Sequence, residues 1–188
     1  MSSQSKISKE KIILGIDPGT NVMGFGIIQI KGISITMISM GSIQMKDGNH
    51  ADKLKRIFEK TLELVDNYMP DEVALEAPFY GKNVQSMLKL GRAQGVSMAA
   101  ALYRNTPITE YSPRKIKQSI TGSGAASKEQ VAGMLQSILK IDQLPKHLDA
   151  TDGLAVALCH HYQSTNILSD GSKKGWASFI SQNPNRVK

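Results

Sequence analysis

Two apolar segments of the chain end in a carboxylate. The segment ILGIDPGTNVMGFGII, residues 13–28, contains an apolar run that stops at Asp17, and the segment EVALE, residues 72–76, stops at Glu76. A carboxylate at the end of a buried strand is unfavourable unless a cation pairs with it. If the two strands are neighbours, both carboxylates project at one edge of the sheet, where ligands bind in open α/β folds.

A second pair of acids, Asp149 and Asp152, begins the predicted helix 149–162. Their spacing of three places them on one face of that helix. They precede the apolar stretch GLAVALC, which must pack on the sheet, so we expect the helix start near the same edge. Four converging carboxylates cannot all ionise unless a cation neutralises them.

The chemistry of these ligands narrows the choice of metal. Carboxylate oxygens without a Cys/His cluster favour Mg²⁺ or Mn²⁺ over zinc. Paired ions of this kind promote in-line attack on a phosphodiester. Each acid alone has an ordinary explanation: Asp17 can begin a turn, Glu76 can be a solvated strand end, and Asp149 and Asp152 can stabilise a helix N-terminus. Their joint occurrence favours the metal site.

The distribution of charge supports a nucleic-acid substrate. The chain has 188 residues and a net charge of +7. Residues 78–128 contain eight basic residues and one acid, so this segment carries the whole net charge. We expect it to contribute a polyanion-binding face. The alternative, an ordinary solvated surface, normally mixes both signs of charge.

Other features limit the class of protein. The single cysteine, Cys159, excludes an internal disulfide, and the polar N-terminus has no apolar region typical of a signal peptide. No apolar run is long enough to cross a bilayer. We therefore expect a cytoplasmic protein without membrane contact. The histidines His147, His160 and His161 are expected to be surface or partly buried side chains.

The order of predicted elements indicates an α/β fold with a five-stranded mixed sheet flanked by helices. Residues 1–10 and 163–188 are expected to be flexible tails around one domain, residues 11–162. Gly24 and Gly26 leave bare backbone in a strand, as close packing or ligand approach requires. The predicted strands are 11–16, 22–31, 33–42, 72–76 and 107–111, and the predicted helices are 50–68, 83–104, 113–120, 127–140 and 149–162.

Four blocks of the sequence resemble, in order, the RuvC family of bacterial Holliday-junction resolvases. They are GIDPGTNVMGFGII, LEAPFYGKNVQSMLKLGRAQGV, YSPRKIKQSITGSGAASKEQV and DATDGLAVALCHH. An Asp-Pro-Gly-Thr strand end alone is a weak signal, whereas the four blocks in this order are specific. The resemblance spans residues 11–162, which is the whole predicted domain.

The resemblance implies a ribonuclease-H-like fold and a Mg²⁺-dependent, structure-specific endodeoxyribonuclease. Such an enzyme nicks two like-polarity strands of a four-way DNA junction symmetrically and leaves ligatable 5′-phosphate ends, in homologous recombination and DNA repair. Two Mg²⁺ ions per subunit are implied, with Mn²⁺ as a substitute. The implied partners are junction DNA, a second copy of the chain bound through the helix 83–104, and RuvA and RuvB.

The resemblance also assigns residues by position. The catalytic, metal-binding acids are Asp17, Glu76, Asp149 and Asp152, with Asp17 bridging the ions. Some family members carry histidine at the position of Asp149. The aromatic Phe79 is implied to stack on bases, although a place in the core is the alternative from the residues alone. The implied DNA-binding residues are Phe79, Lys82, Arg114, Lys115, Lys117 and Lys128.

Three other functions are compatible with parts of the pattern. Shorter YqgF-type nucleases, linked to ribosomal RNA processing, share the Asp-x-Gly-Thr strand end but lack the EAPFYGKN block. Actin-like and sugar-kinase ATPases also share the strand end, but they need a second phosphate loop and a longer chain. A junction-binding module without catalysis is expected only if the four acids fail to converge.

Overall fold

The computed structural model describes residues 10–45, 48–78 and 83–170. One mixed sheet has the strand order β3-β2-β1-β4-β5. Strand β1 pairs antiparallel with β2 and parallel with β4, and β4 pairs parallel with β5. The strands are β1 (Glu10–Asp17), β2 (Val22–Lys31), β3 (Ser34–Gln44), β4 (Glu72–Glu76) and β5 (Ile108–Tyr111).

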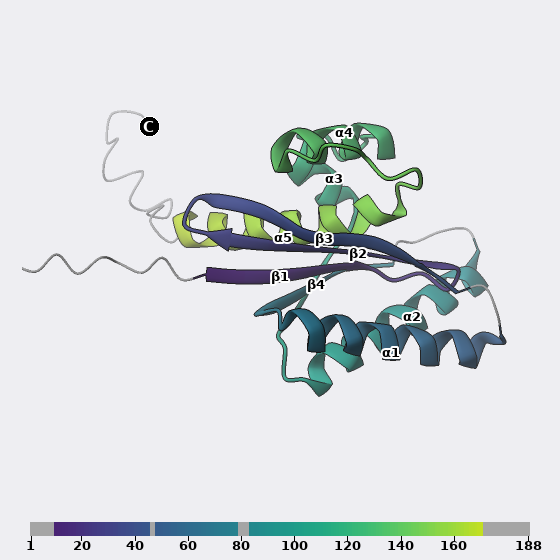
Figure 1. Cartoon of the computed structure of the whole chain (residues 1–188). Coiled ribbons are helices and arrows are strands. Elements are labelled where there is room, and N and C mark those ends of the chain that lie inside the picture. The colour runs from purple at the N-terminus through teal and green to yellow at the C-terminus, as the bar shows by residue number, and fades with distance from the viewer. Residues whose placement is uncertain (1–9, 46–47, 79–82, 171–188) are drawn as a thin grey trace, which may run out of the picture.

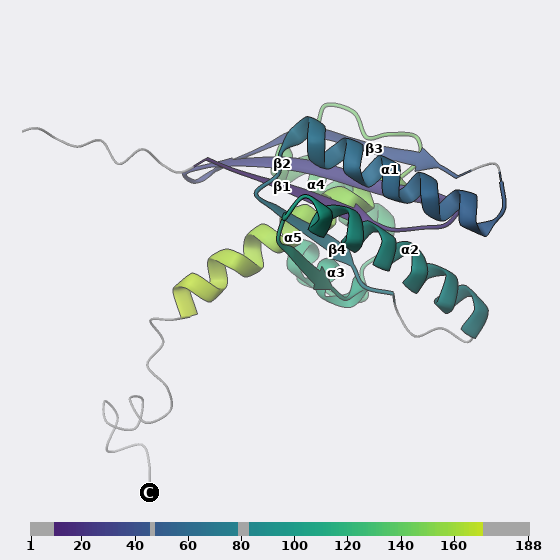
Figure 2. The same ribbon diagram turned by 90° about the horizontal axis from the view of Figure 1, so that it is seen from below.

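Helices cover both faces of this sheet (Figure 1). Two helices lie on one face, α1 (His50–Tyr68) and α2 (Val84–Tyr103), and they run side by side (Figure 2). The opposite face carries α3 (Pro113–Thr121), α4 (Lys128–Leu139) and α5 (Asp149–Asp170). The predicted five-stranded mixed sheet flanked by helices is therefore confirmed.

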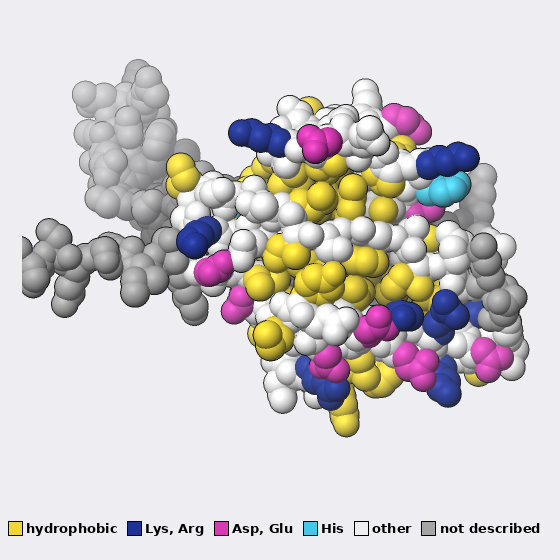
Figure 3. Space-filling model, viewed as in Figure 1, with side chains coloured by type: hydrophobic (Ala, Val, Ile, Leu, Met, Phe, Trp, Pro, Cys, Tyr) yellow, Lys and Arg dark blue, Asp and Glu magenta, His cyan; other side chains and the backbone are white. Residues whose placement is uncertain are grey.

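Strand β1 lies at the centre of the sheet and separates two hydrophobic cores. Its side chains alternate between the faces, as the pleat requires. Ile13 is fully buried in the core beneath α5, whereas Leu14 and Ile16 are fully buried in the core beneath α1 and α2. Figure 3 shows hydrophobic side chains along the sheet edge formed by β3, with charged side chains on the helices above and below.

Helix α5 lies unusually close to the sheet because glycines line the contact. A methyl group at Gly26 would lie 2.3 Å from the Cα of Leu154, and one at Gly15 would lie 2.2 Å from the carbonyl oxygen of Gly153. A methyl group at Gly153 would in turn lie 2.4 Å from the Cα of Phe25. The predicted role of the β2 glycines in close packing is confirmed, with α5 as the packing partner.

Two expectations differ from the structure. Helix α5 continues to Asp170, although the sequence predicted its end at 162 and a mobile tail from 163. Residues 163–170 contain no glycine or proline to interrupt the helix, and the hydroxyls of Ser164 and Thr165 bond back to the carbonyl of His161.

Within the described ranges, no helix is long and apolar enough to cross a membrane.

The second difference concerns the basic segment 78–128, which does not form one continuous face. Its helix α2 lies on one side of the sheet, whereas α3 and the start of α4 lie on the other. At the far end of α2, Arg104 forms a two-pronged ion pair with Asp66. The sheet comes between the two groups of basic residues, because the crossover through β5 carries the chain from one face to the other.

Candidate active site

The two carboxylates at strand ends are neighbours in the structure. Strands β1 and β4 run parallel with Ile16 opposite Leu75, so Asp17 and Glu76 follow at the next position of each strand. Because side chains alternate, both carboxylates point to the α5 face, away from the core that contains Ile16 and Leu75. The parallel register therefore produces the predicted pair.

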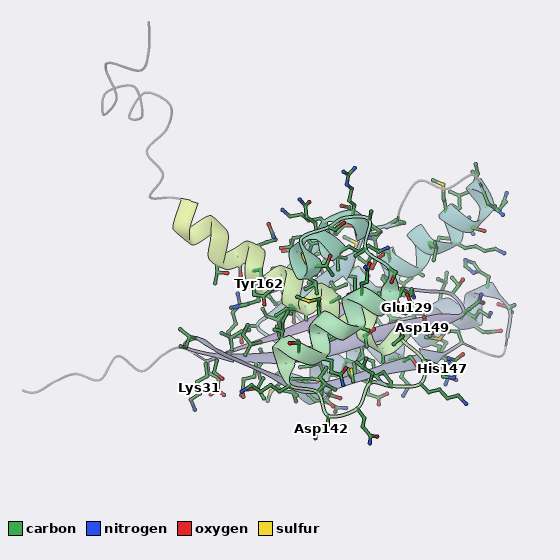
Figure 4. The ribbon with its side chains drawn as sticks, turned by 90° about the horizontal axis from the view of Figure 1, so that it is seen from above. Lys31, Glu129, Asp142, His147, Asp149 and Tyr162 are labelled. Atoms are coloured by element: carbon green, nitrogen blue, oxygen red, sulfur yellow. The ribbon has the colours of Figure 1, made fainter. Side chains whose placement is uncertain are left out.

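The start of α5 adds the other two acids. Asp149 and Asp152 lie in its first turn. The strand glycines fix the position of this turn, because even a methyl group at Gly24 would lie 2.2 Å from the carbonyl oxygen of Asp149. Figure 4 shows Asp149 close to Glu129, at the start of α4, and Tyr162 farther along α5.

The acids from three elements line one hollow of about 320 Å³. Asp17, Glu76 and Asp152 lie there with two lysines, Lys117 and Lys128, whereas Asp149 lies at its margin, within reach of Lys128. The remaining wall comes from the helices above the sheet and consists of Pro113, Ile116, Val131 and Ala155. The hollow therefore combines a charged floor with an apolar wall.

Burial and mutual repulsion keep these carboxylates from ionising easily. Burial, followed by the charge of Asp17, raises the pKa of Glu76 to about 8. Burial and the charge of Asp152 raise the pKa of Asp17 to about 6. Burial also raises the pKa of Asp152, although the hydrogen bond from Lys128 opposes this change. A bound cation strongly stabilises the ionised form of carboxylates whose pKa values are raised in this way.

Lys128 supplies one positive charge to the cluster. Its Nζ donates to Asp152 Oδ2 at 2.5 Å and to Asp149 Oδ1 at 3.4 Å. Burial disfavours the ammonium, but the two acids outweigh this effect and raise the pKa of Lys128. The charge of Lys117 acts on Glu76 and Asp152 without an ion pair among the described residues.

The other predicted DNA-binding residues lie elsewhere. Arg114 and Lys115 are exposed on α3 and do not line the hollow. The alkyl part of Arg114 packs against Gly124, and the charge of Lys115 acts on Cys159. Phe79 and Lys82 fall outside the described residues.

Sequence reasoning missed the residues that support the strand ends. Gln94 on α2 is buried and donates from Nε2 to the backbone oxygen of Glu76 at 3.4 Å and to the carboxylate of Glu110. A single glutamine in a helix carries no signal of this role. Its spacing from the buried Ala93 and Ser97 would have indicated only an inward position.

The expectation for His160 was also incorrect. His160 is buried, and its ring contacts the Tyr111 hydroxyl at 2.9 Å through Nδ1 and the Glu72 carboxylate through Nε2. Glu72 is also bonded to Lys11 at 2.6 Å. This chain of polar contacts joins α5 to β4 and β5 two turns beyond the acids.

The residues of the hollow fit a hard divalent cation. All the candidate ligands are carboxylates, and two of them are half-buried with raised pKa values. Among the described residues, no three Asp, Glu, His or Cys side chains are yet arranged closely enough to hold an ion. The ammonium of Lys128 lies within ion-pair distance of both Asp149 and Asp152.

Carboxylates at neighbouring strand ends, facing a helix that carries further acids, place the chain in the class of ribonuclease-H-like nucleases. A comparison with protein families makes the assignment specific. The family "Crossover junction endodeoxyribonuclease RuvC" matches residues 13–160. The chain belongs to this RuvC family of Holliday-junction resolvases, which are metal-dependent endodeoxyribonucleases.

Curated relatives support this membership over the full length. The crossover junction endodeoxyribonuclease RuvC of Christiangramia forsetii is 60% identical over 100% of this chain and 98% of its own. The protein of the same name from Bacteroides fragilis is 58% identical over 96% of this chain and 97% of its own.

Solved structures support the fold. Thermus thermophilus RuvC in complex with a Holliday junction substrate is similar with a TM-score of 0.76 and 29% identity, over 82% of this chain and 94% of that one. The yeast mitochondrial resolvase Ydc2, with a TM-score of 0.57 and 14% identity over 81% of this chain and 82% of its own, shares the fold alone. The predicted ribonuclease-H-like fold is confirmed.

Proposed function

We propose that this resolvase nicks two like-polarity strands of a four-way junction symmetrically, with the four acids as the metal-binding and catalytic groups. The observation that carries the proposal is the hollow in which Asp17, Glu76 and Asp152 meet Lys117 and Lys128. Carboxylates attract a cation and lysines attract a phosphate, so the hollow suits a phosphodiester brought to a metal.

We infer that the metal is Mg²⁺, with two ions per subunit and Mn²⁺ as a substitute. The oxygen-only donor set, completed by Asp149, supports this choice. When bound, the metal supplies Lewis-acid activation of water and of the phosphodiester. Binding a cation favours the ionised forms of Asp17 and Glu76 and so offsets the burial that raises their pKa values.

The two lysines of the hollow are proposed to act on the phosphate. Their fixed positive charges favour the negative charge that develops in the transition state. Lys117 already faces the carboxylates, and Lys128 would have to leave Asp152 to reach a phosphate. Arg114 and Lys115 on α3 are proposed to contact the DNA backbone outside the hollow, and Phe79 and Lys82 stay predictions from family position.

We also infer a homodimer that forms through α2. One face of this helix is buried against the rest of the chain, with Ala93, Ser97 and Ala100 at its centre. The opposite face is exposed and apolar, and methyl groups at Gly91 and Gly95 would meet nothing within 4 Å. This stripe, exposed except at the half-buried Gly91, consists of Val84, Leu88, Gly91, Gly95, Ala99 and Leu102. A second copy packed there would place two active sites on one junction.

Further parts of the proposal rest on family membership alone. RuvA and RuvB are the proposed partners in the processing of junctions. A cytoplasmic location and a nuclease domain over residues 11–162 stay predictions from the sequence.

A nicking assay tests the function. Purified protein is incubated with an end-labelled synthetic four-way junction and with a linear duplex of the same sequence, in Mg²⁺ or EDTA. We expect paired, ligatable nicks on the junction alone, lost in EDTA. Cutting of linear or RNA-containing substrates would instead indicate the related nuclease activity, and tight binding without cutting would indicate a binding module.

The variant Asp17→Asn tests the assignment of the acids in the same assay. We expect cutting to be lost while junction binding is unchanged or tighter, because one metal ligand is removed and the repulsion of phosphate decreases. Asp142→Asn is the matched control, because Asp142 is exposed in the loop after α4 (Figure 4). Normal cutting by Asp17→Asn would show that the metal-site assignment is wrong.

A further inference from the structure

A second polar hollow lies at the same end of the sheet as the active site. It has a volume of about 460 Å³ and is formed by the turn after β1 and the first turns of α1 and α2. Figure 2 shows that both helices begin at this end. The side chains that carry the argument are Thr20, Asn21, His50, Lys53, Ser86 and Lys89.

The positive charges of this hollow lack partners within the described residues. Neither Lys53 nor Lys89 forms an ion pair there. Lys53 donates to the side-chain oxygen of Asn21, at 3.3 Å. The acid of the same turn, Asp52, is occupied by the backbone N–H of Asn49 at 2.9 Å, as part of the capping box of α1. Two cations with no counter-ion in the described part of the chain favour an anionic ligand.

A buried nitrogen in the same wall is also without a partner. The Nε2 atom of His50 is inaccessible to solvent and makes no hydrogen bond with any described residue. Buried polar atoms are nearly always hydrogen-bonded in folded proteins. His50 therefore places an unused hydrogen-bonding atom in the wall of the hollow.

The hollow lies next to a cavity that reaches the carboxylates. A small cavity of about 100 Å³ shares Asp17, Glu76 and Pro113 with the active site. Its wall includes Leu90 of α2, which also lines the hollow with the two lysines. The carboxylates and the two lysines therefore line neighbouring cavities that meet at Leu90.

We propose that this second hollow, the Lys53–Lys89 pocket, binds a backbone phosphate of the DNA strand whose scissile phosphate lies at the carboxylates. The inference rests on the proposed function and deepens it. Lysine, hydroxyl and amide groups are the side chains that contact phosphate oxygens and sugars without reading sequence. The pocket thus sets the register of the strand in the active site and contributes to affinity for any sequence.

The experiment compares the double variant Lys53→Gln/Lys89→Gln with the control Lys31→Gln. Lys31 is exposed at the end of β2, at the opposite end of the sheet from Asp17, and Figure 4 shows its separation from Asp149. Binding is measured in EDTA, on the junction and on a linear duplex, over a series of salt concentrations. Thermal unfolding checks that all variants are folded.

We expect the double variant to bind both DNAs about tenfold more weakly at low salt, because phosphate contacts are insensitive to sequence. The slope of log affinity against log salt should become shallower by about 1 to 2, as counter-ion release falls with each lost contact. The control should stay within about twofold of the unchanged protein, because it removes one exposed charge remote from the strand.

The outcomes separate this inference from the proposed function. If the unchanged protein cuts junctions but the double variant matches Lys31→Gln in affinity and slope, the pocket is not a phosphate site and the function stands. If the unchanged protein does not cut junctions, the proposed function fails. The salt slopes on the duplex then still decide whether the pocket binds phosphate.

Discussion

The Nζ atom of Lys128 lies 2.5 Å from Oδ2 of Asp152, inside the set of acids proposed to bind metal. The same ammonium lies 3.4 Å from Asp149. A protein cation therefore neutralises part of the cluster when no metal is bound. A metal bound through Oδ2 of Asp152 would displace Lys128 from this oxygen, which would free the lysine for a phosphate.

The variant Lys128→Gln should separate metal binding from cutting. We expect Mg²⁺ to bind several-fold more tightly in the absence of DNA, because the competing ammonium is gone. Junction cutting should be slower by about a hundredfold, the usual effect of losing one charge aimed at the transition state. Calorimetric titration of the protein with Mg²⁺ measures the first effect, and single-turnover cutting measures the second.

The control for this prediction is Lys115→Gln, which removes an exposed lysine of α3 outside the hollow. It should leave Mg²⁺ affinity unchanged. Weaker Mg²⁺ binding by Lys128→Gln would show that the Lys128 ammonium does not compete with the metal for the carboxylates. Lys128 would then be a residue that positions the carboxylate ligands.

The free energy of unfolding of the metal-free protein should depend on pH through Asp17 and Glu76. Both pKa values are raised by folding, to about 6 and about 8, so the protonated forms favour the folded state. Their contribution is complete below the ordinary pKa values and is lost as pH rises through the folded ones. Since one pKa unit corresponds to about 1.4 kcal/mol, the loss is on the order of a few kcal/mol.

Urea unfolding in EDTA at pH 5 and pH 8.5 measures this effect. Glu76→Gln should be more stable than the unchanged protein at the higher pH and similar at the lower one. Comparison of the two proteins also cancels the opposite contribution of His161, whose pKa is lowered by burial. Equal stability of the two proteins at both pH values would contradict the raised pKa of Glu76.

The sequence predicts the pair of strand-end acids well because parallel register and alternation determine where Asp17 and Glu76 point. It does not predict how closely α5 approaches the sheet, because that distance depends on backbone contacts between Gly26 and Leu154, which are far apart in the sequence. For the same reason the bonds of His160 to Tyr111 and Glu72 were missed. Periodicity predicts which face is buried, whereas these contacts depend on the tertiary arrangement.

Two glycine substitutions test the importance of this close approach. Gly26→Ala should destabilise the protein by about 1–3 kcal/mol and slow cutting, because the new methyl group forces α5 and its acids away from β1. Gly133→Ala, in the middle of α4, meets nothing within 4 Å and should stabilise the helix by up to about 1 kcal/mol. Chemical denaturation measures both changes, and equal stabilities would contradict the contact at Gly26.

The apolar stripe on α2 gives a prediction for assembly. Leu88 of this stripe is 50% exposed and lies one turn from Gly91, where a methyl group would meet nothing within 4 Å. If this stripe joins two copies, Leu88→Glu places a charge in the interface and should convert the dimer to a monomer, as measured by sedimentation equilibrium. The monomer should lose paired nicking of a junction, because the two cuts then require independent binding events.

Met134→Glu is the matched control for the same charge change. Met134 is 42% exposed on α4, on the opposite face of the sheet from α2. This variant should remain dimeric and should still produce paired nicks. A Leu88→Glu protein that stays dimeric would place the contact on another surface, whereas dissociation of both variants would indicate that any added charge weakens the assembly.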